Sequence, residues 1–115
     1  MEESRLDKKV SGMFADGVIS SENVSIQVVN ASGSVGLGNR LTRVLTNLGC
    51  NVVSVTSARS VERVSQIAFF GNQSYTLQKL RKWLGYPVSD LREKTIADIV
   101  ITVGRDESGK EMSKF

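Results

Sequence analysis

The stretch of the sequence best suited to chemistry is the glycine- and serine-rich segment 30–40, N-A-S-G-S-V-G-L-G-N-R. Its candidate ligand contacts are Asn30, Ser32, Gly33, Gly36 and Arg40. A strand, a glycine-rich loop and a helix in succession direct backbone N–H groups and a helix N-terminus toward one point, which suits phosphate or carboxylate. Arg40 could add charge-assisted hydrogen bonds. These five residues are therefore the candidate site for an anionic ligand group.

The same segment also has a purely structural interpretation, which its spacing favours. The glycines follow the pattern G-x-x-G-x-G, which differs from the G-x-G-x-x-G dinucleotide fingerprint, and no Walker-type G-K-[ST] follows. In the structural interpretation, Asn30 and Ser32 turn the chain. Gly33 then adopts a left-handed conformation, and Gly36 lets the helix approach the sheet.

The composition excludes much other chemistry. The chain has no His and one Cys, Cys50, which excludes a Ser-His-Asp triad, an intramolecular disulfide and a multi-cysteine zinc site. We expect Cys50 to be a small buried hydrophobic residue, not a reactive thiol. Asp98 has no second acidic residue at a spacing that indicates acid–base catalysis, so a capping or turn role is expected. The sequence thus predicts no catalytic residue, no metal site and no cofactor.

Two further groups of candidates surround segment 74–84. The basic residues at 79, 81 and 82 stand beside Trp83 and could bind an anionic polymer or nucleic acid. We favour a solvated helix face with Trp83 partly in the core. Tyr75 and Tyr86 could stack on sugars, but we expect them to close the core at its rim.

Alternating strands and helices must position these candidates. Period-2 alternation and β-branched residues predict strands at 24–29, 51–56, 64–70 and 99–103, with a short edge strand near residue 88. The unbroken apolar run at 99–103 predicts a central place in the sheet. Apolar residues at helical spacing predict helices at 37–48 and 74–84. Ser34 is the expected N-cap of the first helix, and Gly49 and Gly85 are expected to end the two helices.

The two predicted helices carry the same leucine pattern followed by glycine. We therefore predict two β-α-β halves sharing one sheet, an α/β two-layer β-α-β-β-α-β sandwich with both main helices on one face. A three-layer doubly wound sheet is the alternative. The link from Thr56 to Val64 allows a hairpin and is barely long enough for a crossover.

The chain of 115 residues predicts one domain. We place it at residues 23–106, after an N-terminal arm or linker at 1–22 and before a flexible tail at 107–115. Residues 105–115 show no hydrophobic period. Apolar residues at helical spacing over 6–14 indicate a short helix in the arm, ended by Ala15-Asp16-Gly17.

Charge and hydropathy give weaker signals. Lys and Arg total 15 and Asp and Glu 12, a net charge of +3. We take the basic residues to be interleaved with acidic ones, so solubility is the favoured reason for this charge and an anionic partner the alternative. No apolar run has the length of a transmembrane helix, and residues 1–15 do not resemble a signal peptide. We expect a soluble chain, with the possibility open that it is part of a longer protein.

Several motifs, in order along residues 23–106, resemble the LytR C-terminal domain family. A strand V-S-I-Q-V-V leads into N-A-S-G-x-x-G-L, then a helix ending L-G and a strand N-V-V-S-V. Residues 97–106, A-D-I-V-I-T-V-G-R-D, resemble the family's A-D-[VI]-x-[VI]-x-[VL]-G-x-D terminus. The chain departs from the pattern at Gly38, where the family usually has Ala, and at Phe69-Phe70-Gly71, where a tyrosine and a more polar loop are common.

This resemblance implies an extracytoplasmic domain of the bacterial cell envelope. Such domains often follow a LytR-CpsA-Psr phosphotransferase domain or hang from an N-terminal membrane anchor. By resemblance, the function is a non-enzymatic binding or accessory module that contacts wall polymers, their anionic precursors or an envelope protein partner. Contact with the membrane would come only through an anchor outside this chain.

Two alternative functions belong to other classes. A small intracellular nucleic-acid-binding domain is possible in principle, because an RRM-like sheet has the same order of strands and helices. Such sheets read bases with paired aromatic residues, whereas Phe69 and Phe70 are adjacent and so point to opposite faces, which makes nucleic acid the less favoured partner. A phosphate-handling enzyme would use the glycine-rich segment, but no nucleophile, base or metal cluster accompanies it.

Overall fold

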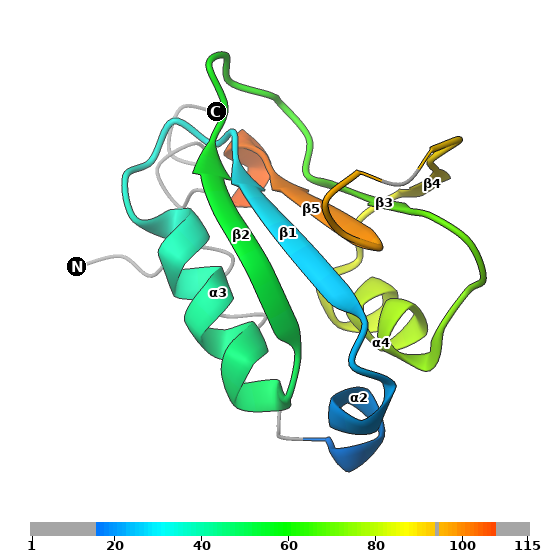
Figure 1. Ribbon diagram of the computed structural model, residues 1–115. Helices are drawn as coiled ribbons and strands as arrows, with labels where there is room; N and C mark the ends of the chain where they lie inside the picture. The colour runs from blue at the N-terminus through cyan, green and yellow to red at the C-terminus, as the bar shows by residue number, and fades with distance from the viewer. Residues whose placement is uncertain (1–15, 94, 108–115) are drawn as a thin grey trace.

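The chain folds into alternating strands and helices over residues 16–93 and 95–107, which are the residues that a computed structural model describes (Figure 1). In chain order the elements are α2 (Gly17–Glu22), β1 (Ser25–Asn30), α3 (Leu37–Leu48), β2 (Asn51–Ser57), β3 (Gln66–Phe69), α4 (Tyr75–Leu84), β4 (Val88–Asp90), β5 (Ile99–Val103) and the 3-10 helix η1 (Arg105–Glu107). The predicted strands and both main helices are present, including the short strand expected near Val88.

One five-stranded sheet has the order β2-β1-β5-β3-β4. β1 is parallel to both β2 and β5, β3 is parallel to β4, and β3 is antiparallel to β5. The units β1-α3-β2 and β3-α4-β4 are therefore the two predicted β-α-β halves, and β5 lies between them at the centre of the sheet. This arrangement confirms the two-layer α/β fold rather than the three-layer alternative.

A single apolar core lies between the sheet and the helices. Its buried members are Ile19, Ile26, Val28, Leu37, Leu41, Leu45, Leu48, Cys50, Ile67, Phe69, Leu77, Leu80, Leu84, Tyr86, Ile99, Ile101 and Val103. Because α3 and α4 share this one cluster, both helices cover the same face of the sheet. The alternate residues of the central strands, such as Gln27, Val29 and Thr102, are half-buried on the opposite face.

The link between β2 and β3 does not form a hairpin, because β1 and β5 separate these strands. It crosses the carboxyl ends of β1 and β5 instead. The N–H of Ala58 donates to the carbonyl oxygen of Asn30 at 2.9 Å, and the N–H of Glu62 donates to that of Ala31 at 2.8 Å. The N–H of Arg105 donates to the carbonyl oxygen of Glu62 at 2.9 Å. The chain itself thus covers part of the sheet end at which open α/β sheets usually bind ligands.

A six-residue helix, α2, is docked on α4 within the region expected to be an arm. Asp16 is the N-cap of this helix and accepts a hydrogen bond from the N–H of Val18 at 2.9 Å. Ile19 is 1% exposed. The Glu22 carboxylate accepts from the N–H groups of Tyr75 and Thr76 at 2.9 and 2.7 Å. Two N–H groups at the start of α4, which have no partner within the helix, therefore donate to a carboxylate of the same chain.

The first residues of the aperiodic segment 105–115 are ordered. Residues 105–107 form η1, and Glu107 is 1% exposed. Its carboxylate accepts a hydrogen bond from the hydroxyl of Tyr86 at 2.9 Å. This buried contact fixes residues that lack any hydrophobic period, which explains why the sequence pattern missed them. The helix predicted over 6–14 and the remainder of the tail lie outside the described residues.

Candidate functional site

Asn30, at the end of β1, organises the loop that leads to α3. Its side-chain oxygen accepts hydrogen bonds from the N–H and the hydroxyl of Ser32 at 3.1 and 2.6 Å. Its side-chain nitrogen donates to the carbonyl oxygen of Ser34 at 2.9 Å. Ser32 is 5% exposed, and its hydroxyl accepts from the N–H of Ser34 at 3.0 Å. The side chains of Asn30 and Ser32 therefore hold the shape of the loop, as short polar side chains commonly do in turns.

Two exposed glycines let this loop turn into the helix. Gly33 and Gly36 have φ angles of 79° and 88°, a left-handed conformation that favours glycine. Gly36, not the predicted Ser34, is the N-cap of α3, which begins without a side-chain cap. The reason is that Gly36 has a left-handed backbone with φ 88°, which interrupts any helix begun at Ser34, so the regular helix starts at Leu37.

Two adjoining hollows flank the loop where β1 and β2 end. The larger, of about 310 Å³, is lined by Asn30, Val35, Gly36, Gly38, Asn39, Val55, Thr56 and Ser57. The smaller, of about 190 Å³, is lined by Asn30, Ala31, Gly33, Ser34, Val35, Ser57, Ala58, Ser60 and Val61. Asn30, Val35 and Ser57 line both, so we treat the two as one feature, the β1–β2 groove. Its polar side chains are hydroxyl and amide groups, and none of its lining residues is charged.

The structure brings together three of the five predicted contact residues. Asn30, Gly33 and Gly36 line the β1–β2 groove. Ser32 is buried beneath the loop, and Arg40 is exposed on α3 without lining either hollow. The groove also contains hydroxyl residues that the sequence argument missed, such as Ser57 and Ser60. They follow β2, and only the parallel pairing of β1 with β2 reveals that the two strand ends meet.

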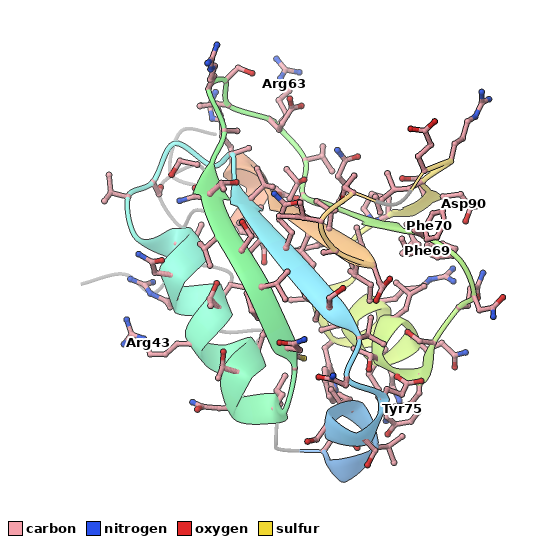
Figure 2. The ribbon with its side chains drawn as sticks, in the orientation of Figure 1. Arg43, Arg63, Phe69, Phe70, Tyr75 and Asp90 are labelled. Carbon is pink, nitrogen blue, oxygen red and sulfur yellow. The ribbon has the colours of Figure 1, made fainter. Side chains whose placement is uncertain are left out.

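The half of the molecule that holds this groove carries positive charge only. Between Asn23 and Val61 the sequence has no Asp or Glu, and its charged residues there are Arg40, Arg43 and Arg59. The expectation that basic and acidic residues alternate along the chain was therefore wrong for this half. Arg43 projects from α3 away from the sheet (Figure 2). An unbroken run without acidic residues was the signal in the sequence that would have revealed this asymmetry.

Comparisons with known proteins identify the family and a structure of similar fold. The family model described as "LytR cell envelope-related transcriptional attenuator" matches residues 23–106, most of the chain. The chain belongs to this LytR C-terminal family. The crystal structure of the soluble domain of a conserved hypothetical secreted protein from Mycobacterium marinum has a similar fold, with a TM-score of 0.61 at 15% identity over 94% of this chain and 73% of that one. The search of curated proteins found no match.

In this LytR C-terminal domain, the two aspartates of the A-D…G-x-D motif make structural hydrogen bonds. The Asp98 carboxylate accepts from the hydroxyl of Ser25 at 3.0 Å, which joins the starts of β1 and β5. The Asp106 carboxylate accepts from the N–H and the hydroxyl of Ser65 at 3.0 and 2.6 Å. The structural role expected for Asp98 is confirmed. Among the described residues, no group of three or more acidic, His or Cys side chains could hold a metal ion.

The glycine of the same motif is required by close backbone packing. A Cβ atom added to Gly104 would lie 2.7 Å from the carbonyl carbon of Val64 and 2.9 Å from the nitrogen of Ser65. The hydroxyl of Ser65 also accepts from the N–H of Gly104 at 2.8 Å. The end of β5 therefore packs closely against the β2–β3 link. The same link forms one wall of the β1–β2 groove.

The remaining candidates have structural roles. Cys50 is 8% exposed, and burial raises the pKa of its thiol to about 11, as expected for an unreactive cysteine. Trp83 is half-buried against the core, as expected for this residue. Tyr86 is 4% exposed and belongs to the core cluster, in agreement with the expected packing role. The Lys79 ammonium lies 5.5 Å from the ring centroid of Tyr75 and 5.8 Å from that of Trp83, a cation–π arrangement on the surface of α4.

The face of the sheet opposite the helices lacks the aromatic pair of an RRM-like sheet. Phe69 is buried in the core on the helix-covered side. Gln27, Val29 and Thr102 occupy the central strands on the other side. Stacking on bases needs aromatic rings on that face, and the described parts of β1, β3 and β5 present none there.

Proposed function

We propose that this domain is a non-enzymatic binding module of the cell envelope that holds a wall polymer or its anionic precursor in the β1–β2 groove. The observation that carries the proposal is the groove itself. Its polar side chains are hydroxyl and amide groups, set among Val35, Val55 and Val61 at the carboxyl ends of two parallel strands. The segment 23–61, which supplies every lining residue, has arginines as its only charged residues. Membership of a family described as cell envelope-related supports this setting.

The chemistry of the groove suits a polyhydroxylated chain with anionic groups. Side chains such as Asn39, Ser57 and Ser60 can donate to and accept from sugar hydroxyls. Arg40 and Arg59 supply positive charge on elements next to the groove, and opposite charge speeds association and selects the partner. In this proposal Asn30 and Ser32 shape the loop, while Gly33 and Gly36 offer backbone at the contact surface.

The location we propose is extracytoplasmic. The envelope-related family description and the fold shared with a domain of a secreted protein support it. No helix in the described part of the chain is long and apolar enough to cross a membrane. Any attachment to the membrane would therefore come through residues other than the described ones.

The proposal is tested by measuring the affinity of the full chain for an anionic wall polymer with variants of the groove. Gly33→Val should weaken binding about tenfold, because a side chain at φ 79° distorts the loop and its Cβ would meet Val61 Cγ2 at 3.2 Å. Arg40→Glu should weaken binding by a comparable factor, more at low salt than at high salt.

The matched control is Arg81→Glu, which makes the same charge change on α4 in the other half. We expect it to leave the affinity within about twofold of the parent, because screened charges act over about a Debye length. Circular dichroism confirms that each variant is folded. Unchanged affinity in folded Gly33→Val and Arg40→Glu would remove the groove as the binding site.

A further inference from the structure

The two edges of the sheet differ in how they are protected from pairing with another chain. β4 has three residues, follows Pro87 and ends at Asp90. β2 has seven residues, N-V-V-S-V-T-S, with no charged residue and no proline. Short strands, proline and charges are the usual devices that prevent edge-to-edge pairing. The β4 edge therefore carries three such devices, and the β2 edge carries none of these three. A β-bulge at Val53 is the protective feature that β2 does have.

The outer backbone edge of β2 pairs with no other described strand. Among the described strands, β2 pairs with β1 alone. Val53 and Val55 are 47% and 39% exposed, which is unusual for valines in the longest strand of a sheet. The register shift opposite Ile26 and Gln27 leaves Val53 as the extra residue, and from Ser54 onward β2 continues in regular parallel pairing to Ser57.

The charges around this edge select the kind of partner. α3 packs along β2 (Figure 1), and its charged residues are Arg40 and Arg43. The segment after β2 adds Arg59, and no acidic residue occurs between Asn23 and Val61. A second copy of the chain would bring two such positive halves together. An acidic partner would meet the opposite charge of Arg40, Arg43 and Arg59.

We propose that the β2 edge binds an extended, acidic segment of a partner protein, which adds a sixth strand to the sheet. Main-chain hydrogen bonds supply the affinity in this mode of recognition, and alternate side chains supply the specificity. The exposed valines pack against apolar residues of the added strand, and the arginines on α3 and after β2 favour its acidic ones. This surface adjoins the β1–β2 groove, because Val55 also lines the larger of its two hollows, but strand pairing along the outer backbone of β2 does not depend on a polymer binding in the groove.

The test uses the full chain, an acetylated and amidated probe peptide of sequence EVTVTVE, and its counterpart KVTVTVK. We expect saturable binding of the acidic peptide and at least about tenfold weaker binding of the basic one. On binding, amide exchange should slow at β2 and stay unchanged at β4. Val53→Glu should abolish binding of the acidic peptide, because it places like charge at the edge.

Two matched variants keep this test falsifiable. Val53→Lys removes the same valine but adds positive charge, so it should still bind the acidic peptide. Ile96→Glu adds the same negative charge at an exposed aliphatic residue remote in sequence from β2, so it should bind the peptide as the parent does. Equal affinity for the two peptides would overturn the proposal, as would protection outside β2. Sedimentation that shows a β2-dependent dimer would also overturn it, since a second copy would then be the occupant. Gly33→Val should leave peptide binding intact, which separates this surface from the groove.

Discussion

At the scale of single residues, Gly104 is the position where the least chemical change should have a large effect. A methyl group there would lie within 3 Å of backbone atoms of Val64 and Ser65, which cannot move aside as a flexible side chain could. We expect Gly104→Ala to lower the free energy of unfolding by about 3 kcal/mol, the upper range for an overpacked site. Urea denaturation measures this change.

The control for this substitution is Gly17→Ala in the first turn of α2. It changes the unfolded chain in the same way, but nothing lies within 4 Å of the added atom. We expect it to be neutral or to stabilise by up to about 1 kcal/mol, because alanine favours helix. Equal stability of the two variants would contradict the close packing of β5 against the crossing link.

Tyr86 is the second residue whose effect is local and measurable. Its hydroxyl donates to the buried Glu107 carboxylate at 2.9 Å, so Tyr86→Phe would leave that carboxylate without this donor. The expected loss of stability is about 2 kcal/mol. Burial, and then the negative charge of Glu107, raise the pKa of Tyr86 well above its usual value of 10.0. Because the unfolded chain would ionise first, stability should fall as pH rises above that usual value.

Chemical denaturation at neutral and alkaline pH tests both statements. Tyr75→Phe is the comparison, because Tyr75 is only half-buried and its hydroxyl donates to Asp16 near the surface. If Tyr86→Phe were no more destabilising than Tyr75→Phe, the buried contact with η1 would not contribute as described.

At the scale of elements, the docking of α2 on α4 should depend on pH. Burial would raise the pKa of Glu22, but its hydrogen bonds from Thr76 and Tyr75 outweigh this effect and hold the pKa below the usual 4.5. The hydrogen bond from Tyr75 likewise lowers the pKa of Asp16. The stabilisation is therefore complete above the usual pKa values and is lost as pH falls through the lower values of the folded state.

We expect Glu22→Gln to speed amide exchange in α2 at neutral pH and to flatten its dependence on pH between about 5 and 3. Glu93→Gln, at an exposed position in the β4–β5 loop, is the control and should leave α2 unchanged. A parent-like exchange profile in Glu22→Gln would show that this carboxylate does not hold α2 in place.

Most of the elements followed from local patterns, and the errors came from contacts across the sequence. Leucines at helical spacing and the glycines at 49 and 85 gave α3 and α4 with their ends, because each signal lies within one turn of what it determines. The ordered η1 depends on Tyr86, which lies 21 residues earlier in the chain. No local pattern contains such information.

In the candidate site, too, the sequence predicted the residues that lie close together in the chain and missed those that the fold brings together. Asn30, Gly33 and Gly36 lie in one loop, so their sequence order alone placed them together. Ser57 and Ser60 come from the other side of the groove, and they join it only because β1 and β2 pair in parallel. Arg40 was expected at the contact surface, but it lies on α3, four residues after Gly36, and lines neither hollow.

At the scale of the whole molecule, the uneven distribution of charge along the chain determines where we expect an anionic ligand to bind. The residues from Asn23 to Val61 carry arginines and no acidic residue, while all twelve acidic residues lie outside that range. An anionic ligand should therefore approach the β1-α3-β2 half, and its association should weaken as salt screens the attraction.

The most direct test of the central claim is an amide NMR titration of the labelled chain with an anionic wall polymer, soluble peptidoglycan fragments and a short RNA, each at two salt concentrations. We predict saturable shifts with a wall ligand that cluster at residues 30–40 and 56–61, together with little response to RNA. Shifts with RNA alone would contradict the account and favour a nucleic-acid-binding domain. Shifts with a wall ligand that fall on α4 or the β4 edge would contradict the proposed groove.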